Sequence, residues 1–172
     1  MWLRLNFVRI GDHWLDRYDK IVDQFLAHDM RIYGTVGHEV VHAEDMNIFR
    51  DFNPPPANMT DQQRRWIENY VDTFDEIVHR FEGRIHVFES FNEPDDWQIG
   101  SVAGFEDLSE HEKARYKRPI VQPKWFAEML HRIYQRVHSS VDVTLVSGPV
   151  TGNWGNSNSG GWVSGRGHPV WS

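Results

Sequence analysis

Residues 88–97, FESFNEPDDW, place an amide and a carboxylate side by side at the end of an apolar stretch. A β-strand holds its side chains rigidly, and Pro94 ends the strand because proline has no backbone N–H to donate. The carboxyl group of Glu93 is then fixed where the strand ends, and the Asn92 amide can donate a hydrogen bond to a ligand hydroxyl. This combination is typical of a positioned general acid.

The alternation of side chains along the strand that leads into this segment predicts where the neighbouring side chains point. In an extended strand residues 89, 91 and 93 share one face, and residues 90 and 92 share the other. We therefore expect Asn92 and Glu93 to point in different directions around the end of the strand. Glu89 lies on an apolar strand, and we expect it to pair with Arg4 of another strand, because buried charges are normally paired.

A second segment, HEVVH at residues 38–42, offers a different chemistry. In an α-helix this spacing places two imidazoles on one face, where they can bind zinc beside a glutamate that acts as general base. Here the segment follows a predicted strand directly, and Asp45 and Ile48 stand where the longer zinc motif has glycine and histidine. An HExxH zinc metalloprotease is therefore the alternative interpretation, and we predict no metal site.

Hydrophobic periodicity predicts alternating strands and helices. The helices include one with a capping box formed by Thr60 and Gln63 and one opened by Pro123. The predicted strands are 2–8, 31–37, 84–91 and 141–150, and the predicted helices are 14–26, 60–81 and 123–137. Connections too long for hairpins indicate right-handed βαβ units and a parallel sheet, with the chemistry at the carboxyl ends of the strands.

The segment VFESFNEPD resembles the strand-four motif of the retaining (β/α)8 glycoside hydrolases of clan A, in its family 39-like or family 5-like form. The resemblance implies that Glu93 is the acid/base residue and that Asn92 contacts a sugar hydroxyl. It also implies that Arg4 lies near the site and that His38 binds substrate. Trp97 is a further candidate because indole rings stack on sugar rings.

The fold class that follows is α/β, a partial (β/α)8 TIM barrel of about four parallel strands with covering helices. A closed barrel needs about 200 to 250 residues, and this sequence has 172. We assign the partial barrel to residues 1–150 and a Gly/Ser/Asn/Trp-rich loop or tail to residues 151–172. In the family the nucleophile follows strand seven, so we expect this chain alone to lack the second carboxylate of a hydrolytic site.

Composition limits the partners. The net charge is −7, and there is no run of Lys or Arg, which excludes nucleic acid and membrane as main partners and favours a carbohydrate substrate. We predict no cofactor, and a homodimer through the open sheet edges. No signal peptide or membrane span is visible, so the chain is cytoplasmic as written and its true compartment is unknown. A non-catalytic carbohydrate-binding protein is the third interpretation.

Overall fold

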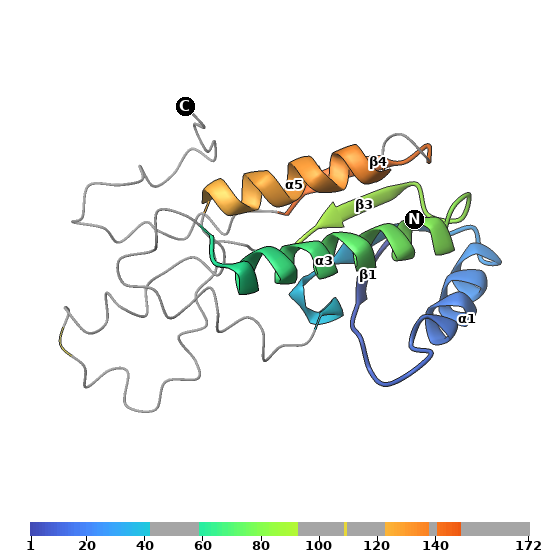
Figure 1. Cartoon of the computed structure of the whole chain (residues 1–172). Helices are drawn as coiled ribbons and strands as arrows, with labels where there is room; N and C mark the ends of the chain where they lie inside the picture. The colour runs from blue at the N-terminus through green and yellow to red at the C-terminus, as the bar shows by residue number, and fades with distance from the viewer. Residues whose placement is uncertain (42–58, 93–108, 110–122, 138–140, 149–172) are drawn as a thin grey trace.

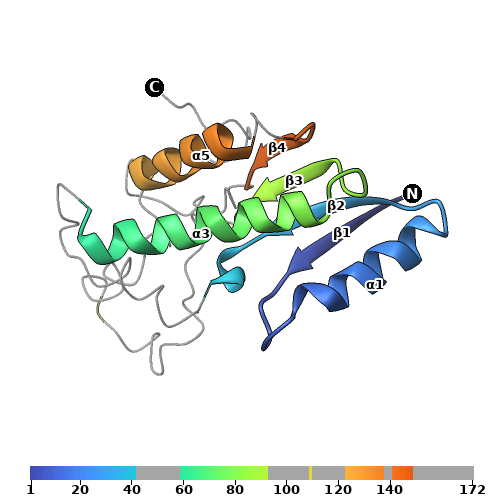
Figure 2. The same cartoon turned by 45° about the vertical axis from the view of Figure 1, so that its right-hand side comes forward.

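The computed structural model describes residues 1–41, 59–92, 109, 123–137 and 141–148. The elements in chain order are β1 (Trp2–Phe7), α1 (Leu15–Leu26), β2 (Arg31–Val36), the 3-10 turn η1 (His38–Val40), α3 (Asp61–Arg80), β3 (Val87–Ser90), α5 (Pro123–Val137) and β4 (Thr144–Ser147). Within these residues the strands form a parallel sheet in the order β1-β2-β3-β4 (Figures 1 and 2). The predicted α/β class with four parallel strands is confirmed.

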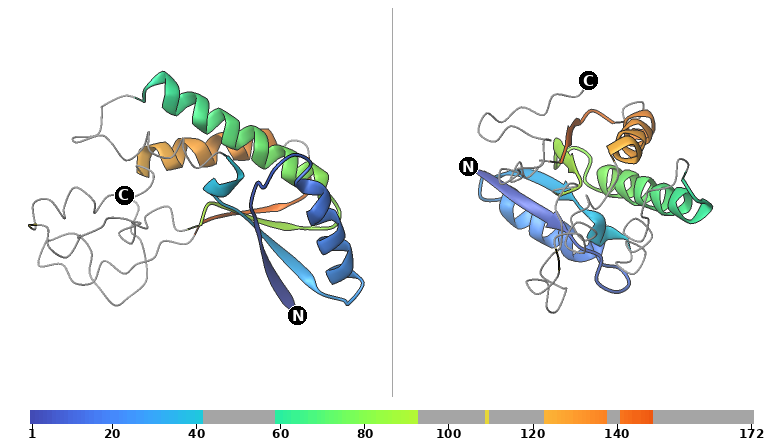
Figure 3. Two further views of the ribbon diagram at one scale, coloured as in Figure 1. Left: turned by 90° about the horizontal axis from the view of Figure 1, so that it is seen from below. Right: turned by 90° about the vertical axis from the view of Figure 1, so that its left-hand side faces the viewer.

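The helices lie on one face of this sheet. Strands that follow one another in sequence and in space, joined by crossovers of one hand, place every crossover helix on the same side. Figure 3 shows α3 and α5 above the sheet and α1 beside them on the same side. Ring contacts confirm the packing. The centre of the Phe7 ring of β1 lies 4.7 Å from that of Tyr18 of α1 and 5.3 Å from that of Phe81. The ring centres of Phe74 of α3 and Phe88 of β3 are 6.3 Å apart.

Gly34 of β2 shows how tightly this covered face is packed. A Cβ atom at Gly34 would lie 3.0 Å from the Phe88 ring and 3.2 Å from the Phe7 ring. Both rings are fully buried, so neither can move away without disturbing the core. Glycine at this position therefore lets the two aromatic rings approach the strand backbone.

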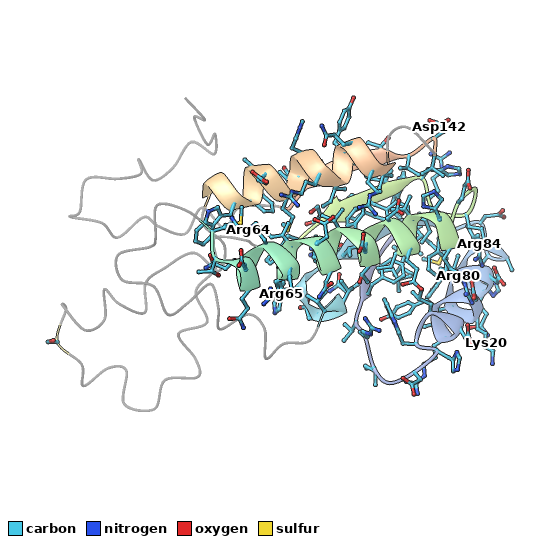
Figure 4. All side chains as sticks on the ribbon, viewed as in Figure 1. Lys20, Arg64, Arg65, Arg80, Arg84 and Asp142 are labelled. Carbon is cyan, nitrogen blue, oxygen red and sulfur yellow. The ribbon has the colours of Figure 1, made fainter. Side chains whose placement is uncertain are left out.

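Helix α3 is the central helix of the covered face. Thr60 and Gln63 form the predicted capping box at its start, and Gly83, with a φ of +72°, follows its end. Ion pairs join α3 and the turn after it to their neighbours: Arg80 at the end of α3 and Arg84 in the turn contact acidic residues of α1, and Figure 4 shows both beside α1. Arg132 of α5 contacts Glu68 at 2.6 Å.

The strand boundaries differ from the predictions by a few residues. The predicted strand 84–91 begins only at Val87, because the backbone N–H groups of Arg84 and Ile85 both donate to the Phe81 carbonyl in the turn after α3. Of the predicted strand 141–150, β4 occupies Thr144–Ser147. The predicted tail 151–172 lies outside the described residues. In the part of the chain that the structure describes, no helix is long and apolar enough to cross a membrane.

Candidate active site on the polar face of the sheet

The sheet face opposite the helices carries a connected polar network. Arg4 of β1 donates from Nε to Thr35 Oγ1 of β2 at 2.9 Å and from Nη2 to Glu89 Oε1 of β3 at 3.3 Å. Thr35 Oγ1 lies 3.2 Å from Glu89 Oε2. The predicted pairing of Arg4 with Glu89 is confirmed, and it reaches across the intervening strand. The Glu89 side chain is 3% exposed and the Arg4 side chain 46%.

Asn92 joins this network at the carboxyl end of β3. Its Oδ1 accepts a hydrogen bond of 2.6 Å from Arg4 Nη2. The structure therefore brings together two of the predicted site residues. The other two residues predicted around the same loop, Glu93 and Trp97, lie outside the described residues.

Tyr33 of β2 adds a phenol to the same face. Burial, the negative charge of Glu89 and a hydrogen bond to that carboxylate raise the pKa of Tyr33 to about 12. Each of these effects disfavours the phenolate, because a second negative charge would be placed next to the first in a partly dry environment. The phenol of Tyr33 therefore stays protonated at neutral pH.

The prediction that residues 89, 91 and 93 share one face is wrong at Phe91. The Phe91 ring is buried on the helix-covered side, 5.8 Å from the Tyr70 ring and 6.0 Å from the Phe126 ring. Asn92, predicted on that side, instead contacts Arg4 on the polar face. The alternation of side chains is thus shifted by one residue at the end of β3.

The backbone of Phe91 causes this shift. Its φ is +71°, a left-handed conformation that costs a non-glycine residue about 1–2 kcal/mol. The Phe91 N–H donates to the Val36 carbonyl at 2.8 Å and to the Tyr70 hydroxyl at 3.1 Å. Tyr70 in turn donates to the same carbonyl at 2.5 Å. These buried contacts hold the unusual conformation, and with it the direction of the next residue.

Gly148, directly after β4, fixes the same peptide from the other side. Its N–H donates to the Ser90 carbonyl at 2.7 Å. A Cβ atom at this position would overlap the Phe91 carbonyl oxygen. The backbone that leads into Asn92 is therefore enclosed by β2, α3 and the end of β4.

His38 begins η1 at the carboxyl end of β2. Its side chain is 15% exposed, its ring lies 5.7 Å from the Phe91 ring, and its Nδ1 lies 3.7 Å from Glu39 Oε2. The predicted substrate-binding histidine thus lies beside the residue that precedes Asn92. Its direct contact to a ligand remains a prediction.

The zinc interpretation lacks the helix that it requires. Within the HEVVH segment His38–Val40 form a single 3-10 turn, and Val41 is extended with φ −109° and ψ 160°. Two imidazoles four residues apart share a face only in a continuous α-helix. His42 lies outside the described residues, and within them no three His, Asp or Glu side chains are grouped to hold a metal ion.

Three residues of the site were not singled out from the sequence. Tyr33 and Thr35 lie on the same face as Arg4, and the alternation along β2 was a signal that could have identified them. Tyr70 lies in a helix whose apolar spacing explained it as packing. Nothing in the local sequence shows that its hydroxyl reaches the end of β3.

No protein-family model matches this sequence, and a search of curated proteins found none that is similar. The resemblance carried by the NEP segment therefore stays a prediction. The function has to be argued from the chemistry of the polar face.

Proposed function

We propose that the polar face of the sheet is the acid/base and sugar-binding part of a glycoside hydrolase site. The observation that carries the proposal is the hydrogen bond from Arg4 to Asn92, the residue directly before Glu93. It anchors the chain that leads into Glu93 to an ion pair whose carboxylate, Glu89, is buried near the carboxyl end of a parallel strand. Such strand ends hold the catalytic groups in barrel and open α/β enzymes.

We further propose that the sheet is part of a (β/α)8 barrel. The consecutive strand order and the one-sided helices support this, because a singly wound sheet leaves its other face without helices. That face carries a charged pair with a nearly inaccessible glutamate, Glu89. Closure of the sheet would enclose the face and give its polar groups the protected surroundings of a barrel interior.

In this proposal Glu93 protonates the glycosidic oxygen as the bond to the leaving group breaks. A retaining enzyme also requires a second carboxylate about 5 Å away that attacks the anomeric carbon, and it then uses the first residue as a base toward water. Asn92 binds the sugar beside the scissile bond, and Arg4 holds Asn92 in place. The nucleophile is not assigned to a described residue.

The test measures both binding and hydrolysis of a panel of 4-nitrophenyl β-glycosides and of plant and bacterial polysaccharides by the chain, because the second carboxylate is not assigned to a described residue. Glu93→Gln keeps the size of the side chain and removes its acid, so kcat/KM for substrates with poor leaving groups should fall by about 100-fold or more. Glu128→Gln, on the exposed side of α5, is the matched control and should hydrolyse the same substrates normally.

Each outcome of this test has a definite meaning. Hydrolysis that survives unchanged in Glu93→Gln would show that the acid/base assignment is wrong. Saccharide binding without hydrolysis, lost in Asn92→Ala, would identify a carbohydrate-binding protein that keeps the sugar contacts and no reaction. Neither binding nor hydrolysis across the panel would refute the proposed function.

A further inference from the structure

The hydrogen bonds of the polar network have a defined direction from one end to the other. A guanidinium group has only donors, so each atom facing Arg4 must accept. Arg4 Nε lies 2.9 Å from Thr35 Oγ1, and the Thr35 oxygen is therefore an acceptor in that bond. Its own proton is left to point at Glu89 Oε2, 3.2 Å away.

Glu89 receives the hydrogen bonds of this network. Arg4 Nη2 approaches Oε1 at 3.3 Å and Oε2 at 3.4 Å, and the Thr35 hydroxyl also donates to the carboxylate. An ionised carboxylate only accepts, so all three contacts agree in polarity. A buried carboxylate surrounded by donors holds its neighbours strongly, because releasing one of them would leave part of its charge unpaired.

The direction of the network decides which atom of Asn92 faces Arg4. The acceptor Oδ1 takes the 2.6 Å hydrogen bond from Nη2, because an NH2 group in that place would meet another donor. The amide nitrogen, on the other branch of the same planar group, then points away from Arg4. It can only donate.

We propose that Glu89 and Thr35 are positioning residues that act through Arg4 to hold Asn92 with its NH2 group presented to the ligand. The matching ligand atom is an oxygen that accepts a hydrogen bond, as sugar hydroxyl and ring oxygens do. This ligand chemistry rests on the proposed function. The orientation of Asn92 rests only on the contacts of the described residues.

The orientation is tested by NMR on the ¹⁵N-labelled chain without ligand. The signals are Arg4 Nε–H, assigned by its loss in Arg4→Lys, and the Asn92 NH2 pair, assigned by its loss in Asn92→Asp. Thr35→Val keeps the shape and removes the hydroxyl. It should speed the exchange of Arg4 Nε–H by about tenfold, as expected for a lost hydrogen bond to a charged group, and it should shift the Asn92 NH2 signals.

Two variants serve as controls for Thr35→Val. Thr35→Ser keeps the hydroxyl and should restore both signals. Thr73→Val makes the same chemical change in α3, where the hydroxyl donates to the Asn69 carbonyl at 2.8 Å, and should change neither signal. Unchanged Arg4 and Asn92 signals in folded Thr35→Val would overturn the proposal. Should that variant not fold, Glu89→Gln weakens the contacts of Arg4 Nη2 and should shift the Asn92 NH2 signals; unchanged Asn92 signals in Glu89→Gln would then overturn the proposal.

The ligand chemistry is tested with whichever 4-nitrophenyl β-glycosides the chain hydrolyses. Asn92→Asp keeps an oxygen for Arg4 and replaces the NH2 donor by an acceptor. It should keep the Arg4 Nε–H signal and lose about 100-fold in kcat/KM, the size of effect that misplacement at a reacting centre produces. Thr35→Val should raise KM more than it lowers kcat, and Thr35→Ser should restore KM.

The proposal and the proposed function can fail separately. Full hydrolysis by Asn92→Asp would refute the donor role, even with Glu93→Gln inactive. Hydrolysis that does not depend on Glu93 would refute the proposed function, and the NMR signals would still decide whether Glu89 and Thr35 orient Asn92.

Discussion

Removing Arg4 from its ion pair with Glu89 should destabilise the protein much more than removing Glu89. Arg4→Met keeps a side chain of similar length and removes the guanidinium, which leaves the Glu89 carboxylate, 3% exposed, with only the Thr35 hydroxyl as a donor. Glu89→Gln leaves the Arg4 guanidinium, 46% exposed, which can turn to water. The two substitutions break the same contact with different consequences for the remaining partner.

The exposed fractions of the two side chains set the expected changes in the free energy of unfolding. Removing one partner of a fully buried pair costs about 3–5 kcal/mol, but Thr35 still donates to Glu89 and Arg4 is half screened by solvent. We therefore expect Arg4→Met to lower the free energy of unfolding by about 2–3 kcal/mol. Glu89→Gln should lower it by about 1 kcal/mol, because Gln still accepts a hydrogen bond and the exposed cation is solvated.

The assay is urea unfolding of the three chains at neutral pH, followed by tryptophan fluorescence and far-UV circular dichroism, with the slopes compared to check that the unfolded states match. Arg64→Met removes an exposed ion pair with Asp61, 2.7 Å long, and should leave the free energy of unfolding unchanged, because water screens exposed pairs. A loss of stability in Arg4→Met no larger than that in Glu89→Gln would show that burial of the carboxylate does not decide the outcome.

Three further predictions follow from single positions. Gly34→Ala should lower the free energy of unfolding in urea by about 1–3 kcal/mol, because the added methyl meets two buried rings; an unchanged midpoint would contradict the packing. Gly148→Ala should displace the carbonyl of Phe91 and so shift the side-chain NH2 signals of Asn92 in the NMR spectrum. Unshifted Asn92 signals would show that Gly148 does not enclose the backbone at Phe91. Because the pKa of Tyr33 is raised from 10.0 to about 12 in the folded state, the unfolded chain binds fewer protons in this range, and stability should fall as the pH rises from 10 toward 12. Tyr33→Phe should reduce that fall in pH-dependent urea unfolding, and Tyr134→Phe, on the exposed side of α5, should not.

The sequence by itself determined the elements and the pairing of charges. Apolar spacing located each described helix to within about two residues, and Thr60 with Gln63 marked the start of α3. The order of strands and helices predicted the parallel sheet. The rule that buried charges are paired was sufficient to predict the ion pair between Arg4 and Glu89. This rule depends on burial and residue type and not on exact geometry.

Only the tertiary structure decided which way the end of β3 turns. Local sequence predicts continued alternation, since a left-handed phenylalanine is unfavourable in an isolated strand. In the folded chain the Phe91 ring is buried among helix residues, and its N–H is held by the Val36 carbonyl and the Tyr70 hydroxyl. These contacts come from elements distant in the sequence, and together they outweigh the local cost. Asn92 is consequently turned to the polar face, where Arg4 holds it.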